Sequence, residues 1–329
     1  SIAVNTDSLS PKYGYAYVVG SVAGTISEID LSFTVVNEIP VGIRPVHICF
    51  NPQNGMLYVS NLASNSVSVI DSISATVNTT VAVGKAPRAT GVNPDNGDVY
   101  VVNSGDNNIS VFDKNHVFID TIGNVGFSPV NITYHPVNKE MYVVSTTSNN
   151  VIPVDTLTYT SLPDIVVGNQ PYGITYNSNN GYLYVLNRND NTISIIAPDK
   201  SIRATIHTGN VNIGIAINQP DNILYVSDTS NNTVNVIGYL EQSSSIVVDD
   251  DYAETNRDIK TNPVILKHAK FVVNGNPDVA KTLTVKNETP TGTVRSNKIS
   301  FTNYSSPQNY MMVAEIFDID GAVIDGKTL

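Results

Sequence analysis

Repeated aspartates are the most regular residues in this 329-residue chain that could do chemistry. A ring of carboxylates could hold a metal ion or activate water. The aspartates lie at a nearly constant spacing, at Asp30, Asp71, Asp113 and Asp155. Each follows a predicted strand and precedes Leu, Ser, Lys or Thr, as the first residue of an Asx-type turn does. We therefore interpret them as turn residues rather than as a catalytic ring.

Histidines are the second group that could transfer protons. The chain contains five, at His47, His116, His135, His207 and His268. They fall at different places relative to the aspartates, so we interpret them as turn or strand-surface residues. The zinc motif H-E-x-x-H, the nucleophile motif G-x-S-x-G and a phosphate-binding loop are absent from the sequence. The sequence therefore predicts no catalytic residue and a chain that is not an enzyme.

An acidic cluster is the one place where the sequence suggests a metal ion. Asp249, Asp250 and Asp251 are consecutive, and carboxylate oxygens suit Ca²⁺. A structural Ca²⁺ here would stiffen a junction between modules; the alternative is a solvated linker. No other cofactor is predicted.

Loop residues could bind a ligand. The phrases "GIRP", "GKAPR" and "GNQPY" place Arg44, Arg88 and Tyr172 in similar positions of successive repeats, which would suit a glycan or a peptide. The alternative is that the proline only stiffens each loop. Glycosylation sequons form a further set of candidates, at Asn78, Asn108, Asn131, Asn231, Asn287 and Asn303. A chain rich in Asn, Ser and Thr also produces sequons by chance, and Asn78, on a predicted outer strand, is the best candidate.

These candidates lie on a repeated unit. Its Tyr-Val pair recurs at Tyr17, Tyr58, Tyr100, Tyr142, Tyr184 and Tyr225, in steps of 41 or 42 residues. Each unit contains four runs of alternating apolar and polar residues; in the second they are 47–50, 57–60, 66–70 and 76–83. Four short strands repeated every 40–45 residues are typical of a β-propeller blade.

The first strand of each unit carries a small residue nine positions before the tyrosine. These residues are Cys49, Gly91, Thr133, Thr175 and Ala216. We expect them to lie where blades crowd together, and we expect Cys49 to be a packed thiol rather than a nucleophile.

The stretch "YVSN…NSVSVID…VNTTVAVGKAPRATGVNPDNGDVYVVN" resembles the YVTN family of β-propeller repeats. The resemblance covers about residues 1–245 and implies a propeller of the kind found in archaeal surface-layer and other cell-surface proteins. Related propellers include lactonases and dehydrogenases, so the resemblance implies the fold more strongly than the function. We expect an extracellular or cell-surface location.

The predicted organisation is all-β. Residues 1–248 form the propeller, with six blades favoured and seven as the alternative, and the sixth blade ends with about residues 243–248. Residues 249–262 form a linker. Residues 263–329 form an immunoglobulin-like β-sandwich, either complete or truncated, in which about five strands are visible where about seven are needed.

Charge and hydropathy restrict the partners. The net charge of −11 disfavours a nucleic acid, and no apolar run is long enough to span a membrane. We therefore expect a non-enzymatic lattice, filament or adhesion component. Its C-terminal module would drive self-association or bind another surface protein by strand addition, or else pair with the propeller's own rim. The alternatives are a glycan- or peptide-binding module and a lactonase-type enzyme with a metal on the propeller axis.

Overall fold

The computed structural model describes residues 1–208, 212–220, 222–230, 233–238, 265–273, 310–317 and 323–328. Within these ranges the protein contains strands and turns and no helix. The described residues therefore include no helix that could cross a membrane. The all-β prediction is confirmed. The chain divides into two units, residues 1–214 and 215–329, which are described separately.

The first unit contains five sheets that follow one another along the chain. The first sheet consists of β1 (Ile2–Val4), β2 (Ala16–Gly20), β3 (Thr25–Ile29) and β4 (Val35–Pro40). The second consists of β5 (Pro45–Asn51), β6 (Met56–Asn61), β7 (Ser66–Asp71) and β8 (Thr76–Ala82). The third consists of β9 (Pro87–Val92), β10 (Val99–Asn103), β11 (Asn108–Phe112) and β12 (Phe118–Ile122).

The fourth and fifth sheets complete this unit. The fourth consists of β13 (Pro129–His135), β14 (Glu140–Ser145), β15 (Asn150–Asp155) and the short strands β16 (Thr160–Ser161) and β17 (Ile165–Val166), which both pair with β15. The fifth consists of β18 (Pro171–Tyr176), β19 (Leu183–Asn187), β20 (Thr192–Ile196) and β21 (Ile202–His207). Every sheet is an antiparallel meander, as the alternation within each repeat predicts.

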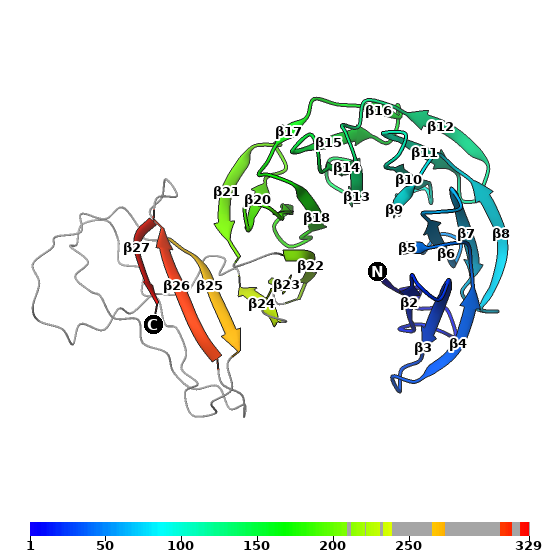
Figure 1. Cartoon of the computed structure of the whole chain (residues 1–329), viewed down its shortest axis with the longest axis horizontal. Coiled ribbons are helices and arrows are strands. Elements are labelled where there is room, and N and C mark those ends of the chain that lie inside the picture. Colours follow the sequence, from blue (N-terminus) through cyan, green and yellow to red (C-terminus); the bar gives the residue numbers. More distant parts are fainter. Residues whose placement is uncertain are drawn as a thin grey trace, which may run out of the picture. The chain divides into compact units, whose positions relative to one another are not determined.

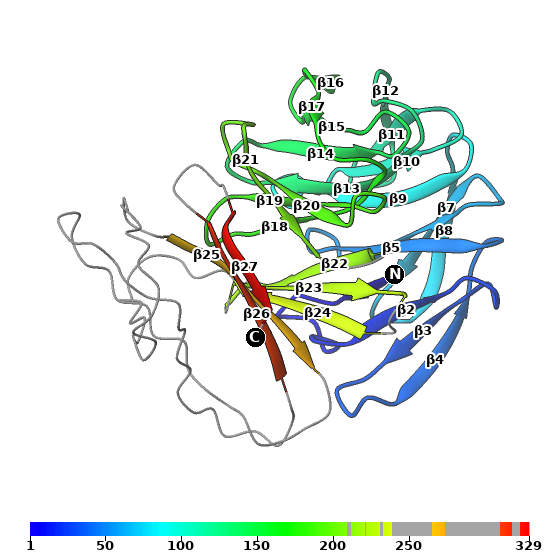
Figure 2. The same ribbon diagram turned by 60° about the vertical axis from the view of Figure 1, so that its left-hand side comes forward.

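These five sheets are blades. In Figure 1 they follow an arc, with the first strand of each blade on the inside and the last on the outside, and Figure 2 shows the same sheets from another side. The inner strands of successive blades contact one another, β5 with β9, β9 with β13 and β13 with β18. The propeller predicted from the tyrosine period is confirmed for these blades.

The small inner-strand residues lie directly opposite the repeated tyrosines. Cys49 pairs with Tyr58 and Gly91 pairs with Tyr100 in the antiparallel register. A Cβ atom added to Gly91 would lie 2.7 Å from the Met141 side chain of the next blade. The predicted crowding is confirmed at this position. Burial raises the pKa of the Cys49 thiol to about 12, which makes it a packed thiol and a poor nucleophile.

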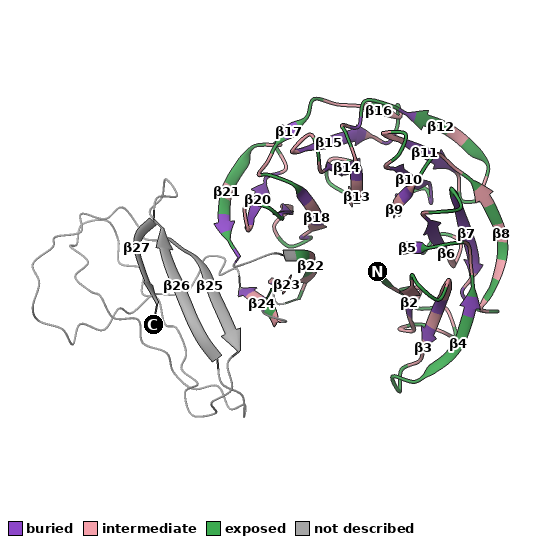
Figure 3. Ribbon diagram, viewed as in Figure 1, coloured by how far each residue is buried: buried purple, intermediate pink, exposed green. Residues whose placement is uncertain are grey.

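The hydrophobic core lies between the blades. Figure 3 shows that the middle strands are mostly buried and the outer strands mostly exposed. All residues of β10, β14 and β19 are buried, whereas β4 has one buried residue. The cores hold the tyrosines together with Ile, Leu and Val from two neighbouring blades. Each blade therefore depends on its neighbours for stability.

The repeated aspartates make Asx turns. The Oδ1 atom of Asp113 accepts the backbone N–H groups of Asn115 and Val117. Asp30, Asp71 and Asp155 make the equivalent bonds. Hydrogen bonds from the Ser32 hydroxyl and the Thr34 N–H lower the pKa of Asp30, and the bond from the Thr158 N–H lowers the pKa of Asp155. The turn interpretation is confirmed, and no carboxylate ring forms from these residues.

The second unit contains one sheet, in the order β22 (Asn212–Asn218), β23 (Ile223–Asp228), β24 (Thr233–Gly238), β25 (Ile265–Val273), β26 (Tyr310–Phe317) and β27 (Val323–Thr328). Its first three strands match the start of a blade, and β25 pairs with β24 in the place of a fourth strand. The predicted closing strand 243–248 and the linker 249–262 lie outside the described residues. The domain boundaries and the sandwich therefore stay predictions.

Candidate functional site

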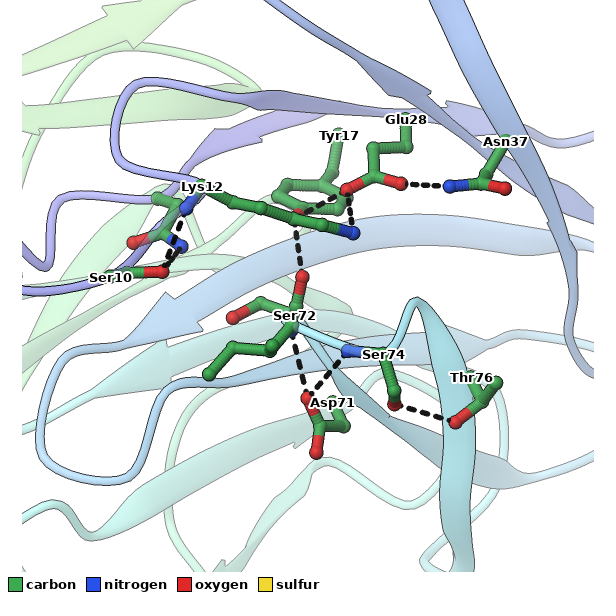
Figure 4. A network of polar contacts seen from close by, with 11 residues as sticks. Ser10, Lys12, Tyr17, Glu28, Asn37, Asp71, Ser72, Ser74 and Thr76 are labelled. Carbon is green, nitrogen blue, oxygen red and sulfur yellow. Dashed lines mark hydrogen bonds and ion pairs between the residues drawn. The ribbon is translucent and has the colours of Figure 1, made fainter.

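The first buried carboxylate belongs to Glu28, in the first blade. The Lys12 Nζ atom lies 2.6 Å from Glu28 Oε1, and the Glu28 side chain is fully buried (Figure 4). The Tyr17 hydroxyl lies 3.1 Å from the same carboxylate oxygen and 3.0 Å from the backbone oxygen of Ser72, in the second blade. Asn37 Nδ2 donates to the other carboxylate oxygen. Burial and the Glu28 charge raise the pKa of Tyr17.

A second buried carboxylate lies between the fourth and fifth blades. Lys200 Nζ donates to Glu140 Oε1 at 2.8 Å, and the Tyr142 hydroxyl donates to Glu140 Oε2 at 2.7 Å. Asn138 Nδ2 donates to the Tyr142 hydroxyl and to the backbone oxygen of Pro198. The Glu140 carboxylate thus has partners from two blades, whereas the partners of Glu28 belong to the first blade and reach the second through the Tyr17 hydroxyl. They hold neighbouring blades together, and neither is open to a substrate.

His135 is fully buried, so its interpretation as a surface residue is wrong, whereas His47 is half-buried. His135 is 0% exposed, its Nε2–H donates to the backbone oxygen of Gly181, and its Nδ1 accepts the Asn138 N–H. On the inner strand β5, His47 Nδ1 accepts the Thr90 N–H at 3.2 Å, and burial lowers the pKa of His47 to about 4. Both rings are neutral at pH 7. His207 is exposed on β21, as predicted, and the side chain of His268 lies outside the described residues.

The three predicted loop residues belong to three different blades. Arg44 is exposed and has a positive φ of 55° just before the second blade. Arg88 and Tyr172 occupy the position after the proline in β9 and β18, two blades apart. Among the contacts of the described residues, none joins these three side chains. Tyr172 lies two residues after Gln170, which lines a hollow.

The hollow lies where three turns of the fourth and fifth blades meet. Its volume is about 480 Å³ and it opens to solvent. We call it the amide hollow. Its lining consists of Thr146, Thr147, Asn149, Asn169, Gln170, Asn189 and Asp190. The β14–β15 turn supplies residues 146–149, the connection to β18 supplies residues 169 and 170, and the β19–β20 turn supplies residues 189 and 190.

Hydrogen bonds between the turns fix the amide hollow. Asp190 accepts the Asn169 backbone N–H at 2.7 Å and the Asn169 Nδ2 at 2.8 Å. Asn149 Oδ1 accepts the Gln170 N–H at 2.9 Å. These two bonds from Asn169 lower the pKa of Asp190, so it is a carboxylate at neutral pH.

The scaffold of the amide hollow recurs in other blades, whereas its lining does not. The Ala86 N–H donates to Asn65 and the Ser128 N–H donates to Asn107, as the Gln170 N–H donates to Asn149. The positions of Thr146 and Thr147 are Leu62 and Ala63 in the second blade. The fourth and fifth blades therefore combine a common turn geometry with a lining of hydroxyl, amide and carboxylate groups. Such groups bind hydroxylated ligands rather than apolar ones.

The sequons differ in accessibility. Asn78 is exposed on β8, whereas Asn108 Oδ1 accepts a hydrogen bond from Asn103, and Asn131 bonds to Tyr172 and Ile132. Asn231, Asn287 and Asn303 lie outside the described residues. When the chain is secreted by a eukaryotic host, we expect a glycan on Asn78 and none on Asn108 or Asn131. Peptide mapping by mass spectrometry checks this, and an occupied Asn108 would contradict it.

Within the described residues, no three His, Cys, Asp or Glu side chains are grouped to hold a metal ion. The predicted Ca²⁺ ligands, Asp249 to Asp251, lie outside those residues, so the Ca²⁺ site stays a prediction.

The blades define the chain as a β-propeller protein, and comparison with known families gives a narrower assignment. Residues 10–257 match the family described as "Lactonase, 7-bladed beta-propeller". This match spans about three quarters of the 329 residues, and the chain belongs to this family. The family description specifies seven blades, whereas the sequence repeats the tyrosine unit six times.

Solved structures support the fold. A chain titled "Kuenenia stuttgartiensis Hydrazine Synthase" is similar at a TM-score of 0.52 and 17% identity, over 72% of this chain and 94% of that chain. At this identity the likeness shows the fold alone. No curated protein matches the sequence.

The family corrects the prediction that this chain is not an enzyme. That prediction relied on the absence of motifs and of a symmetric ring of ionisable residues, and membership of a lactonase family overturns it. Of the amide hollow, sequence reasoning found only the loop "GNQPY" and Tyr172. The missed signal was the set of Thr, Asn, Gln and Asp residues in the turns of the fourth and fifth repeats. The second repeat of the chain has Leu62 and Ala63 where the fourth has Thr146 and Thr147.

Proposed function

We propose that this protein binds a polyhydroxylated lactone in the amide hollow and hydrolyses its ester bond. The observation that carries the proposal is the lining of the hollow, which is made of side chains that hydrogen-bond to hydroxyl groups. Family membership supports the reaction class. The ligand class follows from the lining, because a sugar-like lactone presents several hydroxyl groups and one ester carbonyl.

The lining suggests a role for each kind of group. Asp190 is the one carboxylate in the amide hollow, so it takes the proton of the attacking water. The water oxygen adds to the ester carbonyl carbon, and the ring C–O bond breaks. The departing ring oxygen receives the proton from Asp190, which gives a hydroxy acid. Amide N–H groups of Asn149, Gln170 or Asn189 stabilise the carbonyl oxygen as negative charge develops on it.

Replacement of Asp190 tests this role. We expect the purified protein to hydrolyse D-glucono-1,5-lactone faster than the spontaneous rate, and Asp190→Asn to lower that excess about 100-fold or more, the range for loss of a general base. Because the pKa of Asp190 is lowered, the wild-type activity should persist as the pH falls through the ordinary carboxyl range near 4. Acid release measured in a pH-stat provides the readout.

The control is Asp106→Asn, which changes the equivalent turn of the third blade, where Asp106 accepts the Lys85 N–H. This variant should keep full activity. The proposal is wrong if lactones of both five- and six-membered rings give no rate above background, or if both variants are equally active.

We also propose that the protein acts outside the cell, and the exposed sequon at Asn78 supports this. Peptide mapping of native material tests it, since an N-linked glycan on Asn78 requires export. The predicted assembly through residues 263–329 stays a prediction.

A further inference from the structure

Arg188, next to the amide hollow, is a cation that forms no ion pair with the described residues. The Arg188 guanidinium lies over the ring of Tyr172, with its Cζ atom 6.0 Å from the ring centroid. Arg188 directly precedes the hollow residues Asn189 and Asp190, and its backbone N–H donates to Gln170, another residue of the lining. The backbone of this arginine is therefore fixed at the edge of the hollow.

The pairing of Arg188 with Tyr172 is specific to the fifth blade. The residue after the second strand is Leu62, Ser104 or Thr146 in the three preceding blades. The residue after the proline is Val46, Arg88 or Val130 in those blades. A cation and an aromatic ring thus coincide only here among the four blades, and the repeat scaffold does not require them.

The guanidinium is available to a ligand. Arg188 is exposed, and among the described residues it takes part in no salt bridge. Stacking on an aromatic ring uses the face of a guanidinium and leaves its N–H groups free around the edge. These N–H groups form a rigid fork that matches a carboxylate with two parallel hydrogen bonds.

We propose that Arg188, held on Tyr172, is the anion-recognition residue of the amide hollow, and that the ligand is an acidic sugar that carries a carboxylate. This inference rests on the proposed function, because it uses the same hollow for the hydroxyl groups. The hollow binds the hydroxylated part of the ligand, and Arg188 binds the carboxylate at its edge. Arg188 is thus the residue that selects acidic over neutral sugars.

The surrounding charges are consistent with this selection. The net charge of −11 repels anions in general, so an acidic ligand needs a local cation. Asp190 is the nearest carboxylate along the chain, and both of its oxygens accept hydrogen bonds from Asn169. Asn169 therefore orients Asp190, and among the described residues no ion pair joins Asp190 to Arg188.

Two sugars that differ only at C6 provide the test. D-glucuronate carries a carboxylate where D-glucose carries a hydroxymethyl group, so we would titrate the full chain with each by saturation-transfer NMR in low salt. We expect D-glucuronate to bind about tenfold more tightly than D-glucose, as one charge-assisted pair provides. Arg188→Gln should abolish this preference and leave the affinity for D-glucose unchanged. Tyr172→Leu should reduce the preference by removing the stacking surface.

The matched control is Arg44→Gln, which removes an exposed arginine from the connection before the second blade and should change neither affinity. If D-glucose binds and D-glucuronate binds no more tightly, the anion role of Arg188 is wrong and the proposed function stands. The role is equally wrong if Arg188→Gln keeps the preference. If neither sugar binds and no lactone is hydrolysed, both proposals fall.

Discussion

Replacing Lys12 by methionine is expected to lower the free energy of unfolding by about 3–5 kcal/mol, the cost of leaving one charge of a buried pair without its partner. Glu28 is 0% exposed and Lys12 is 18% exposed in their side chains, so water cannot take the place of the missing ammonium. The Tyr17 hydroxyl links this pair to Ser72, so the loss weakens the contact between the first two blades. Chemical denaturation followed by tyrosine fluorescence measures the effect, since the chain has 17 tyrosines and no tryptophan.

Two further variants separate the buried charge from the loss of a lysine. Lys85→Met breaks a surface pair in which Lys85 is 78% exposed and 4.0 Å from Asp106, and it should cost less than about 1 kcal/mol. Adding Glu28→Gln to Lys12→Met should restore much of the lost stability, because a neutral amide replaces the unpaired carboxylate. Equal effects of Lys12→Met and Lys85→Met would show that Glu28 is not effectively buried.

The blades were predictable from the sequence because their information is local and repeated. Strand alternation and the tyrosine spacing are each encoded within about 42 residues and recur six times, and the aspartate of the Asx turn recurs in four of these copies. Gly91 was predictable for the same reason, since a small residue recurs at this position in five copies. Repetition turns weak local preferences into a firm prediction of the fold.

The buried ion pairs were not predictable in the same way. Lys200 and Glu140 are 60 residues apart and belong to different repeats, so no local pattern relates them. A lysine in a surface-type turn gives no sign that a neighbouring blade will cover it. His135 was misread for this reason, because this histidine at a strand end is packed against Tyr142 and Tyr176 and bonded to Gly181 of the next blade.

The amide hollow was only partly predictable because it combines three turns from two blades. Each turn alone resembles its copies elsewhere, and only their assembly places Asn149, Gln170 and Asp190 around one space. The repeat thus specifies a scaffold, and the residues that distinguish one pair of blades determine what it binds. The mistaken prediction that the chain is not an enzyme arose from searching for motifs and symmetric rings, which a loop-built site does not need.

A single added methyl group at Gly84 is expected to destabilise the protein by about 2–4 kcal/mol, the combined cost of overpacking and of broken buried hydrogen bonds. A Cβ atom on Gly84 would lie 2.7 Å from the Asn103 Cγ and Nδ2 atoms. Asn103 is fully buried, and its Nδ2 donates to Asn108 and Ser110 at 2.9 Å each. The side chain cannot move away from the new methyl group without losing these bonds. Thermal and chemical denaturation of Gly84→Ala measure the loss.

Gly123→Ala is the matched control, because an added Cβ there has no atom within 4 Å, and neither glycine has a positive φ. The control should be neutral or slightly stabilising, since alanine restricts the unfolded chain. In an Asn103→Ala background, Gly84→Ala should cost less than in the wild type, because most of the clashing atoms are gone. If the two losses of stability are additive, the clash with Asn103 does not cause the effect of Gly84→Ala. If the double variant loses less stability than the sum of the two single variants, Asn103 is the reason that this repeat position is glycine.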